Sequence, residues 1–429
     1  MKKAINPDPS TWSTLLERPM ASTQEMDALM LDVFEAVRLN GDQAVRDYTQ
    51  RFDGVLVDQL QVTAQEIEQA KAQVADELKE AISLAKTNIE KFHRAQQTNR
   101  VDVETQPGVQ CWQEKRPIQK VGLYIPGGTA PLFSTILMLA IPATIAGCQE
   151  IVLCSPPNTA GTIHPAILYT AQLCGVDTII KAGGVQAIAA MTLGTKSVPQ
   201  VYKLFGPGNQ YVTAAKQYAT KLGVSIDMPA GPSELLVMAD DSADAAFVAS
   251  DLLSQAEHGA DSQVVLVSTS KTLLSKVEDE MTSQLDALSR KQIAQQAIAN
   301  SVLIYLPTKE LAAALINAYG PEHYILCVEE EDYFLGQIAN AGSVFVGNYT
   351  PESAGDYASG TNHTLPTNGY AKQYSGVNLD SFLKSMTFQR ITAQGIQNIG
   401  PAIELMAAAE GLDAHKNAVT LRLNALNNE

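Results

Sequence analysis

The sequence predicts an α/β protein with two doubly wound, incomplete Rossmann-like domains, a cleft between them, and helical extensions at both ends that take part in dimerisation. Two observations lead to this prediction. Short apolar runs alternate with helical stretches of about 10–15 residues, which is typical of βαβ units with parallel sheets. A proline- and glycine-containing connection at Met228–Ser233 separates two such series. Because each series can form its own sheet, a ligand-binding cleft between the two is expected.

The N-terminal part is predicted to be irregular to about residue 20 and helical from Ser22 to about Gln97. Thr63 and Glu66 have the spacing of a capping box, which opens a long helix running through Ile89. The first α/β series then begins near residue 121. Its strands are expected at Val121–Ile125, Ile151–Cys154, Thr178–Lys181 and Val201–Phe205, and its helices at Leu132–Ala146, Pro165–Leu173, Gln186–Leu193 and Tyr211–Leu222.

The second series follows the connection. Its strands are expected at Leu235–Met238, Val264–Val267, Val302–Tyr305, Tyr324–Val328 and Ser343–Val346, and its helices near Asp244–His258, Leu273–Leu288, Glu310–Tyr319 and Tyr333–Ala339. From Phe382 onward we expect helices without strands, at Gly400–Glu410 and His415–Leu426. These last helices would pack on a neighbouring element or on a second subunit.

Composition narrows the class of protein. A chain of 429 residues with 45% hydrophobic content is long enough for two or three domains. Its formal net charge of −16 argues against nucleic acid and anionic membranes as partners. Five cysteines without a C-x-x-C pair fit a reducing compartment, and Cys154 is predicted to be a core strand residue. No signal peptide or membrane-spanning run is visible, so we expect a cytoplasmic protein.

Four of the six histidines lie in or beside polar clusters of the C-terminal half. Histidine binds transition metals and titrates near neutral pH, so convergence of these clusters would create one site with a metal and an acid/base pair. The clusters are Ser254–His258, Pro321–His323, Gly355–His363 and Ala414–Asn417.

The spacing within the clusters suggests their chemistry. Gln255 and His258 are three residues apart on a predicted helix and therefore share one face, and Asp356 and His415 could complete a metal site with them. The absence of a thiolate disfavours a structural zinc site and leaves room for substrate. Glu322 and His323 follow a Gly-Pro turn and could supply two bases. For each cluster taken alone, a solvated helix end or an exposed turn remains an alternative interpretation.

Three loops could hold ligands. The loop Gly355–His363 follows a predicted strand, and loops at the ends of strands bind ligands in α/β sheets. The turns Tyr124–Gly128 and Phe205–Asn209 lead from a strand into a helix and could present backbone N–H groups to a pyrophosphate. Neither turn has the G-x-G-x-x-G fingerprint. At this point the turns could bind a dinucleotide or could simply connect a strand to a helix.

Seven strings of the sequence together resemble the histidinol dehydrogenase family, in the family's order and over nearly the whole chain. They are SQAEHG at 254–259, GPEH at 320–323, SAGDYASGTNH at 353–363, AHKNAV at 414–419, GLYIPGG at 122–128, FGPGN at 205–209 and DMPAGPSE at 227–234. The resemblance implies a zinc-dependent homodimeric NAD⁺ oxidoreductase that catalyses the last two steps of histidine biosynthesis. It oxidises L-histidinol to L-histidinaldehyde and then to L-histidine.

The resemblance also implies roles for individual residues. It assigns one Zn²⁺ per subunit to Gln255, His258, Asp356 and His415, the acid/base chemistry to Glu322 and His323, and cofactor contacts to Tyr124, Gln186 and Asn209. Substrate contacts are implied for Ser233, Gln255, His258, His323, Asp356, His363, Glu410 and His415. Glu410 and His415 would act in trans, in the partner's site.

The expected domains are an N-terminal extension (1–20), a first α/β domain (21–122 with 235–377), a second α/β domain (123–234) and a C-terminal helical dimerisation segment (378–429). Two other functions stay open from the residues alone. A zinc hydrolase could use Glu322 as its base, but it would not need the two glycine turns. A non-catalytic binding module would have no use for Glu322 and His323.

Overall fold

The computed structural model describes residues 1–19, 24–127 and 130–427. Ser22 and Gly128, which belong to a predicted helix and a predicted turn, lie outside these ranges. The contacts divide the chain into two compact units: Met1–Gln96 with Gln119–Ser381, and Gln97–Ile118 with the chain from Phe382 onward. None of the helices in the described ranges combines the length and apolarity needed to cross a membrane.

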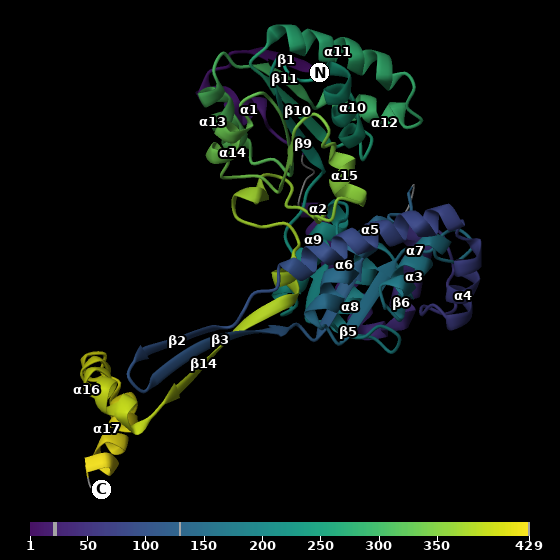
Figure 1. The fold of residues 1–429 in the computed structure, drawn as a ribbon. Helices are drawn as coiled ribbons and strands as arrows, with labels where there is room; N and C mark the ends of the chain where they lie inside the picture. Colours follow the sequence, from purple (N-terminus) through teal and green to yellow (C-terminus); the bar gives the residue numbers. More distant parts are fainter. Residues whose placement is uncertain (20–23, 128–129, 428–429) are drawn as a thin grey trace. The chain divides into compact units, whose positions relative to one another are not determined.

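The first unit contains two parallel sheets, as the two α/β series predicted (Figure 1). The smaller sheet has the order β6-β5-β4-β7-β8. Counted along the chain this order is 3-2-1-4-5, the arrangement of dinucleotide-binding sheets. Its strands are β4 (Lys120–Tyr124), β5 (Glu150–Ser155), β6 (Thr178–Lys181), β7 (Lys203–Phe205) and β8 (Ser225–Ile226).

Two groups of helices accompany this sheet. The connections are α6 (Phe133–Ala146), α7 (Pro165–Leu173), α8 (Gly184–Leu193) and α9 (Gln210–Lys221). The N-terminal helices α2 (Gln24–Asn40), α3 (Asp42–Asp53), α4 (Ala64–Gln73) and α5 (Asp76–Ala95) pack on them. The capping box at Thr63 is confirmed. The prediction of one long helix after it is wrong, because Val74 and Ala75 are extended and the acidic residues Asp76 and Glu77 favour a new helix N-terminus.

The larger sheet has the order β1-β11-β10-β9-β12-β13 and repeats the 3-2-1-4-5 arrangement, with β1 added at one edge. Its strands are β9 (Glu234–Ala239), β10 (Gln263–Ser268), β11 (Val302–Tyr305), β12 (His323–Cys327), β13 (Ser343–Val346) and β1 (Lys2–Ile5). The expectation that residues 1–20 are irregular is therefore wrong. A four-residue edge strand is too short to show a pattern, and its pairing with Val302–Tyr305 becomes evident only in the folded chain.

Helices cover both faces of the larger sheet. In β9, Leu235 and Val237 enter one hydrophobic core, while Leu236 and Met238 enter the other. A strand buried on both faces reads as a continuous apolar run, which is why the sequence revealed it. The remaining elements of this unit are η1 (Pro9–Thr11), α1 (Trp12–Leu15), α10 (Ala245–Ala256), α11 (Lys271–Leu285), α12 (Lys291–Ala299), α13 (Lys309–Tyr319), α14 (Glu331–Gln337), α15 (Glu352–Tyr357), η2 (Tyr370–Lys372) and η3 (Leu379–Phe382).

The second unit joins an antiparallel sheet to a helical hairpin. Its elements are β2 (Val101–Gln106), β3 (Val109–Pro117), β14 (Leu383–Ile391), α16 (Ala393–Ala409) and α17 (Asp413–Asn427). The expectation that no strand follows Phe382 is wrong, because β14 pairs with β3 along its whole length. Both strands carry polar residues on both faces, so the sequence shows no alternating apolar pattern there.

A buried ion pair fixes the start of β9. The Arg18 guanidinium donates to both carboxylate oxygens of Glu234, and to one of them at 2.9 Å. It also donates to the Tyr319 carbonyl at 3.0 Å and lies 3.9 Å from the centre of the Tyr319 ring. Burial raises the pKa of the Glu234 carboxyl group, and the Arg18 charge opposes that rise. Glu234 therefore depends on Arg18 for its charge to be tolerated in the core.

We expect Arg18→Ala to lower the free energy of unfolding by about 3–5 kcal/mol, because it leaves a buried carboxylate without its partner. Urea unfolding measures the loss. Arg38→Ala is the matched control, since it breaks an exposed pair with Glu35 and should cost at most about 1 kcal/mol. Equal losses for the two variants would contradict the importance of the buried pair.

Candidate functional site

The predicted acid/base residues lie where two adjacent strands of the larger sheet begin. β9 and β12 are parallel neighbours, with His323 opposite Leu235. Ser233 directly precedes β9, and Glu322 directly precedes β12. Their side chains therefore start from the same edge of the sheet, which is its amino edge. Asp356 reaches this edge because α15 returns toward it after β13, instead of staying near the carboxyl ends where loops usually bind ligands.

The backbone of Glu234 holds Glu322 and His323. Its N–H donates to the Glu322 carboxylate at 2.9 Å, and its carbonyl accepts from His323 Nδ1 at 3.3 Å. Both side chains are buried. His323 Nε2 has no hydrogen-bond partner among the described residues and lies 3.8 Å from an Asp356 carboxylate oxygen. The imidazole is thus anchored through one nitrogen and presents the other to Asp356.

Carboxylates surround this imidazole. His323 Nδ1 lies 3.6 Å from Glu322 and 3.8 Å from Glu352. Burial disfavours the charged imidazolium, but these two carboxylates outweigh it and raise the pKa of His323 well above its ordinary value. Burial also raises the pKa of Glu352 to about 8. This gathering of carboxylates makes the site suitable for a cation, whose charge would favour their ionised forms.

Three side chains form a cluster that can hold a metal ion. His258, Glu352 and Asp356 each offer one ligand atom, and these atoms lie within 4.8 Å of one another. His258 is exposed, whereas Glu352 is buried and Asp356 is partly buried. Such a set of nitrogen and oxygen donors without a thiolate is suited to a catalytic divalent cation with an open coordination position.

Gln255 supports a metal at this place. It lies in the last turn of α10, just before His258, and α10 contacts α15, which carries Glu352 and Asp356. The Gln255 side chain is fully buried, and neither polar atom has a hydrogen-bond partner among the described residues. An unpaired buried amide costs about 1–3 kcal/mol. A metal ligated by the Gln255 oxygen would remove part of that cost, so the residues present fit the ion.

Glu352 was not identified from the sequence, although a signal was present. It lies four residues before Asp356, and this spacing places both carboxylates on one face of α15. The sequence predicts a loop from Gly355 onward, whereas the helix extends to Tyr357. Without the helix, the relation between the two acids is not apparent.

His363 joins this site to α6. Its Nδ1 donates to the Asp356 carbonyl at 2.9 Å, and its Nε2 lies 3.0 Å from the Thr135 hydroxyl. Burial lowers the pKa of His363, which favours the neutral ring whose Nε2 accepts from Thr135. Thr135, near the start of α6, was not predicted as a site residue, and its connection to His363 arises only from the fold.

Glu410 and His415 belong to the second compact unit. Glu410 follows α16, and His415 lies in the first turn of α17; both are exposed. Their contacts with a metal and a substrate remain predictions.

Two of the three predicted cofactor residues, Tyr124 and Asn209, line one cavity at the smaller sheet, whereas Gln186 is buried behind its lining residues. A cavity of about 870 Å³ is lined by residues that follow the carboxyl ends of four strands, among them Tyr124, Pro156, Gly184 and Asn209. The Tyr124 hydroxyl accepts from the Gly184 N–H at 3.2 Å. Gln186 is buried and donates to Asp53, which also lines the cavity, at 3.1 Å. Sheets with this strand order bind dinucleotides at this edge.

The turn after β7 approaches Tyr124 closely. Gly206 has a φ of +127°, and a Cβ atom at this position would lie 2.1 Å from the Tyr124 carbonyl oxygen. Only glycine fits such a contact. Asn209 then caps α9 by accepting from the N–H groups of Tyr211 and Val212. The glycine turn therefore brings Asn209 to the cavity beside Tyr124.

Comparison with known proteins gives consistent results. A family model described as histidinol dehydrogenase matches residues 16–423. A histidinol dehydrogenase of Bacteroides thetaiotaomicron is 59% identical over 428 residues, covering 99% of this chain and 100% of the relative. One from Yersinia pestis is 54% identical over 417 residues, covering 96% and 93%. The crystal structure of histidinol dehydrogenase from Elizabethkingia anophelis superimposes with a TM-score of 0.97 at 55% identity, covering 100% of this chain and 99% of that one.

We expect Gln255→Leu to weaken zinc binding by about tenfold or more while the metal-free protein stays at least as stable, because the substitution removes two unpaired polar atoms at similar volume. Competition with a chromophoric chelator measures zinc affinity, and thermal unfolding measures stability. Gln263→Leu is the control: Gln263 is equally buried but fully bonded, to Glu17, Asn300 and Tyr319, so its loss should reduce stability and spare zinc affinity. Unchanged zinc affinity in Gln255→Leu would contradict its role as a ligand.

Proposed function

This chain belongs to the histidinol dehydrogenase family, and we propose how its residues carry out the reaction of that family. It is an oxidoreductase of histidine biosynthesis. The reaction proposed is the oxidation of L-histidinol to L-histidine through L-histidinaldehyde, with two NAD⁺ used in succession. The observation that supports this most strongly is the unpartnered Nε2 of His323 beside Asp356, which belongs to the possible metal cluster.

We propose one Zn²⁺ per subunit, held by Gln255, His258 and Asp356 and by His415 from a partner. These residues would hold the ion, which would supply a Lewis-acidic anchor for the nitrogen donors of histidinol and so help to orient its carbinol carbon. The substrate contacts expected from the chain's motifs are Ser233, Gln255, His258, His323, Asp356, His363, Glu410 and His415. Glu352, which adds a second acidic oxygen donor beside Asp356, would compensate the charge of the cation.

His323 is the proposed base of the alcohol step. Its anchored Nδ1 fixes the ring. The charge of a bound cation would oppose the nearby carboxylates and favour the neutral imidazole, whose Nε2 would accept the hydroxyl proton of histidinol while the hydride leaves the same carbon for NAD⁺. In the aldehyde step Glu322 would deprotonate the water that hydrates the aldehyde. His323 would then accept a proton from the resulting diol while the hydride on the same carbon passes to the second NAD⁺. The buried position of both residues limits escape and side reactions of the aldehyde.

NAD⁺ is proposed to bind in the cavity at the carboxyl edge of the smaller sheet, through Tyr124, Gln186 and Asn209. Two features support this position. The strand order of the sheet is that of dinucleotide-binding folds. The cavity is also lined by Ala130 and Pro131, just before α6, whose Thr135 bonds His363. The nicotinamide end of the cofactor would therefore lie on the side of the cavity near α6, which the Thr135–His363 contact joins to the proposed substrate site.

With zinc-loaded protein, L-histidinol and excess NAD⁺, we expect about two NADH for each histidinol consumed, as two successive two-electron oxidations require. Absorbance of the reduced nicotinamide and chromatography of histidine measure the two quantities. A control reaction without NAD⁺, in which only a hydrolase could act on the substrate, should release no product. A yield of one NADH per histidinol, or none, would contradict the proposed reaction.

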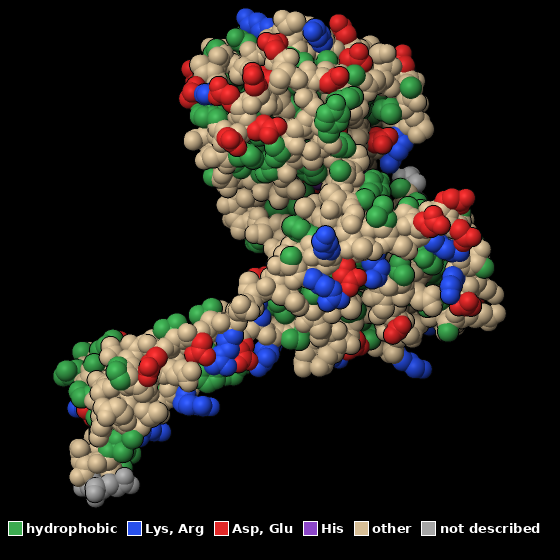
Figure 2. All heavy atoms as spheres, viewed as in Figure 1, with side chains coloured by type: hydrophobic (Ala, Val, Ile, Leu, Met, Phe, Trp, Pro, Cys, Tyr) green, Lys and Arg blue, Asp and Glu red, His purple; other side chains and the backbone are tan. Residues whose placement is uncertain are grey.

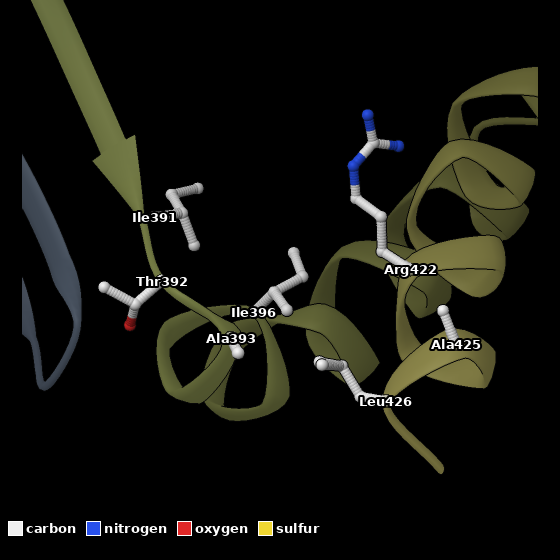
Figure 3. A pocket seen from close by; sticks show the side chains of 7 residues that line it. All are labelled: Ile391, Thr392, Ala393, Ile396, Arg422, Ala425 and Leu426. Carbon is white, nitrogen blue, oxygen red and sulfur yellow. The ribbon is translucent and has the colours of Figure 1, made fainter. Parts of the chain in front are cut away.

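We further propose that the second unit dimerises with a second copy of the chain. Of its large hydrophobic side chains, Leu405, Met406 and Leu421 are more than 60% exposed, and Val101 and Val103 at least half exposed. Figure 2 shows hydrophobic side chains along the surface of this unit. A hollow of about 330 Å³ between β14 and the two helices is also largely apolar, with Ile391, Ile396 and Leu426 directed toward it (Figure 3).

Such a unit has little core of its own. Exposed large apolar side chains in such number are typical of a protein interface, and closed two-fold symmetry is the commonest way for a chain to cover them. Because Glu410 and His415 lie on this same unit, the proposed dimer would carry them together. This supports, as a proposal, the completion of each zinc site by the partner's His415.

Mixing His415→Ala subunits with His323→Ala subunits tests this arrangement. Neither homodimer should be active, but each mixed dimer has one site with both histidines, so re-associated subunits should regain roughly a quarter of wild-type activity. Subunits exchanged in mild denaturant and assayed after refolding provide the measurement. No recovery above the two parents would show that His415 serves its own chain or none.

A further inference from the structure

Asp53 places a carboxylate in the proposed cofactor cavity. It is the last residue of α3, it is half-buried, and its Oδ2 accepts from Gln186 Nε2 at 3.1 Å. Among the described residues that line the cavity it is the only carboxylate, and none of them is a lysine or an arginine. Arg51 contacts the Phe52 ring but does not line the cavity. A ligand in this cavity therefore meets one fixed negative charge and no fixed positive one.

The position of Asp53 is not explained by stability. A carboxylate at the C-terminal end of a helix faces the negative end of the helix dipole. Burial raises the pKa of Asp53 to about 6, which means that the fold disfavours its charged form. At neutral pH the group is still mostly ionised. A residue that breaks two local rules in this way is expected at a functional position.

Other residues indicate which part of a dinucleotide lies near Asp53. Because hydride transfer requires contact with the substrate, the nicotinamide belongs near Ala130 and Pro131, beside α6. Asp53 comes with Phe52 and Leu29 from α2 and α3, which pack on α8 and α9 and do not contribute to the substrate site. Apolar and aromatic side chains such as these suit the flat adenine ring.

Dinucleotide-binding sheets usually place the acid that binds the adenosine ribose after their second strand. Here that strand is β5, and Pro156, Pro157, Asn158 and Thr159 follow it without an acidic residue. Asp53 supplies the missing carboxylate from a helix instead.

On the basis of the cofactor site proposed above, we propose that Asp53 selects NAD⁺ over NADP⁺. Its carboxylate accepts a hydrogen bond from the 2′-hydroxyl of the adenosine ribose and repels a 2′-phosphate at that position. Gln186 holds the carboxylate in place and is a positioning residue for this contact.

Asp53→Asn tests the charge alone, because asparagine keeps the shape and one acceptor oxygen. With zinc-loaded protein and L-histidinol, the ratio of kcat/KM for NAD⁺ to that for NADP⁺ should fall about tenfold or more. Asp53→Ser, which also makes room for a phosphate, should lower the ratio at least as far. Asp47→Asn is the matched control, since Asp47 is exposed on the same helix outside the cavity and the same charge is removed. Its ratio should equal that of the wild type.

A second measurement does not depend on any variant. The discrimination of the wild-type protein against NADPH binding, followed by nicotinamide fluorescence, should weaken as salt screens the repulsion. Unchanged ratios in folded Asp53→Asn, or discrimination that does not respond to salt, would overturn the role of Asp53. If the wild-type protein shows no histidinol-dependent reduction of NAD⁺, the proposed function itself fails, so the two failures are distinguishable.

Discussion

The pairing of β9 with β12 is the constraint on which the chemistry of this protein depends. Through it, one backbone unit, that of Glu234, donates to Glu322 and accepts from His323. The Glu234 side chain cannot relax away from this position, because Arg18 and Tyr319 bond it in the core. A buried ion pair is weak evidence for stability, and here its better explanation is positional, since it fixes the strand that orients both proposed bases.

The sequence allowed the two parallel sheets to be predicted because their strands are buried on both faces and read as apolar runs. It also allowed Gln255 and His258 to be paired, since their relation is local to one helix. It did not reveal β14 or β1, whose partners lie far away in the chain, and it did not reveal Thr135 or Asp53. Each of these acts through a contact with a residue from another element, and such contacts follow from tertiary packing that no local pattern records.

The two sheets carry their proposed sites at opposite edges. The proposed cofactor cavity lies at the carboxyl edge of the smaller sheet, as expected for its strand order, whereas the proposed acid/base pair lies at the amino edge of the larger one. The start of α6 explains how both can serve one reaction, because the residues before it line the cavity and Thr135 within it bonds His363. One short segment thus belongs to the cofactor side and to the substrate side. A shift of α6 would separate the two reactants, and hydride transfer tolerates little separation.

Three side chains of this protein are placed where the fold gains nothing from them. Gln255 has an unpaired buried amide, Glu352 has a buried carboxylate without a hydrogen bond among the described residues, and Asp53 has a carboxylate at the wrong end of a helix. Buried ion pairs in the same unit, such as Lys216 with Asp227 and Arg18 with Glu234, show how the fold can compensate a buried charge. Gln255 and Glu352 instead lie at the proposed metal site, and Asp53 lines the proposed cofactor cavity. A protein that must bind ligands keeps such groups at the expense of its own stability.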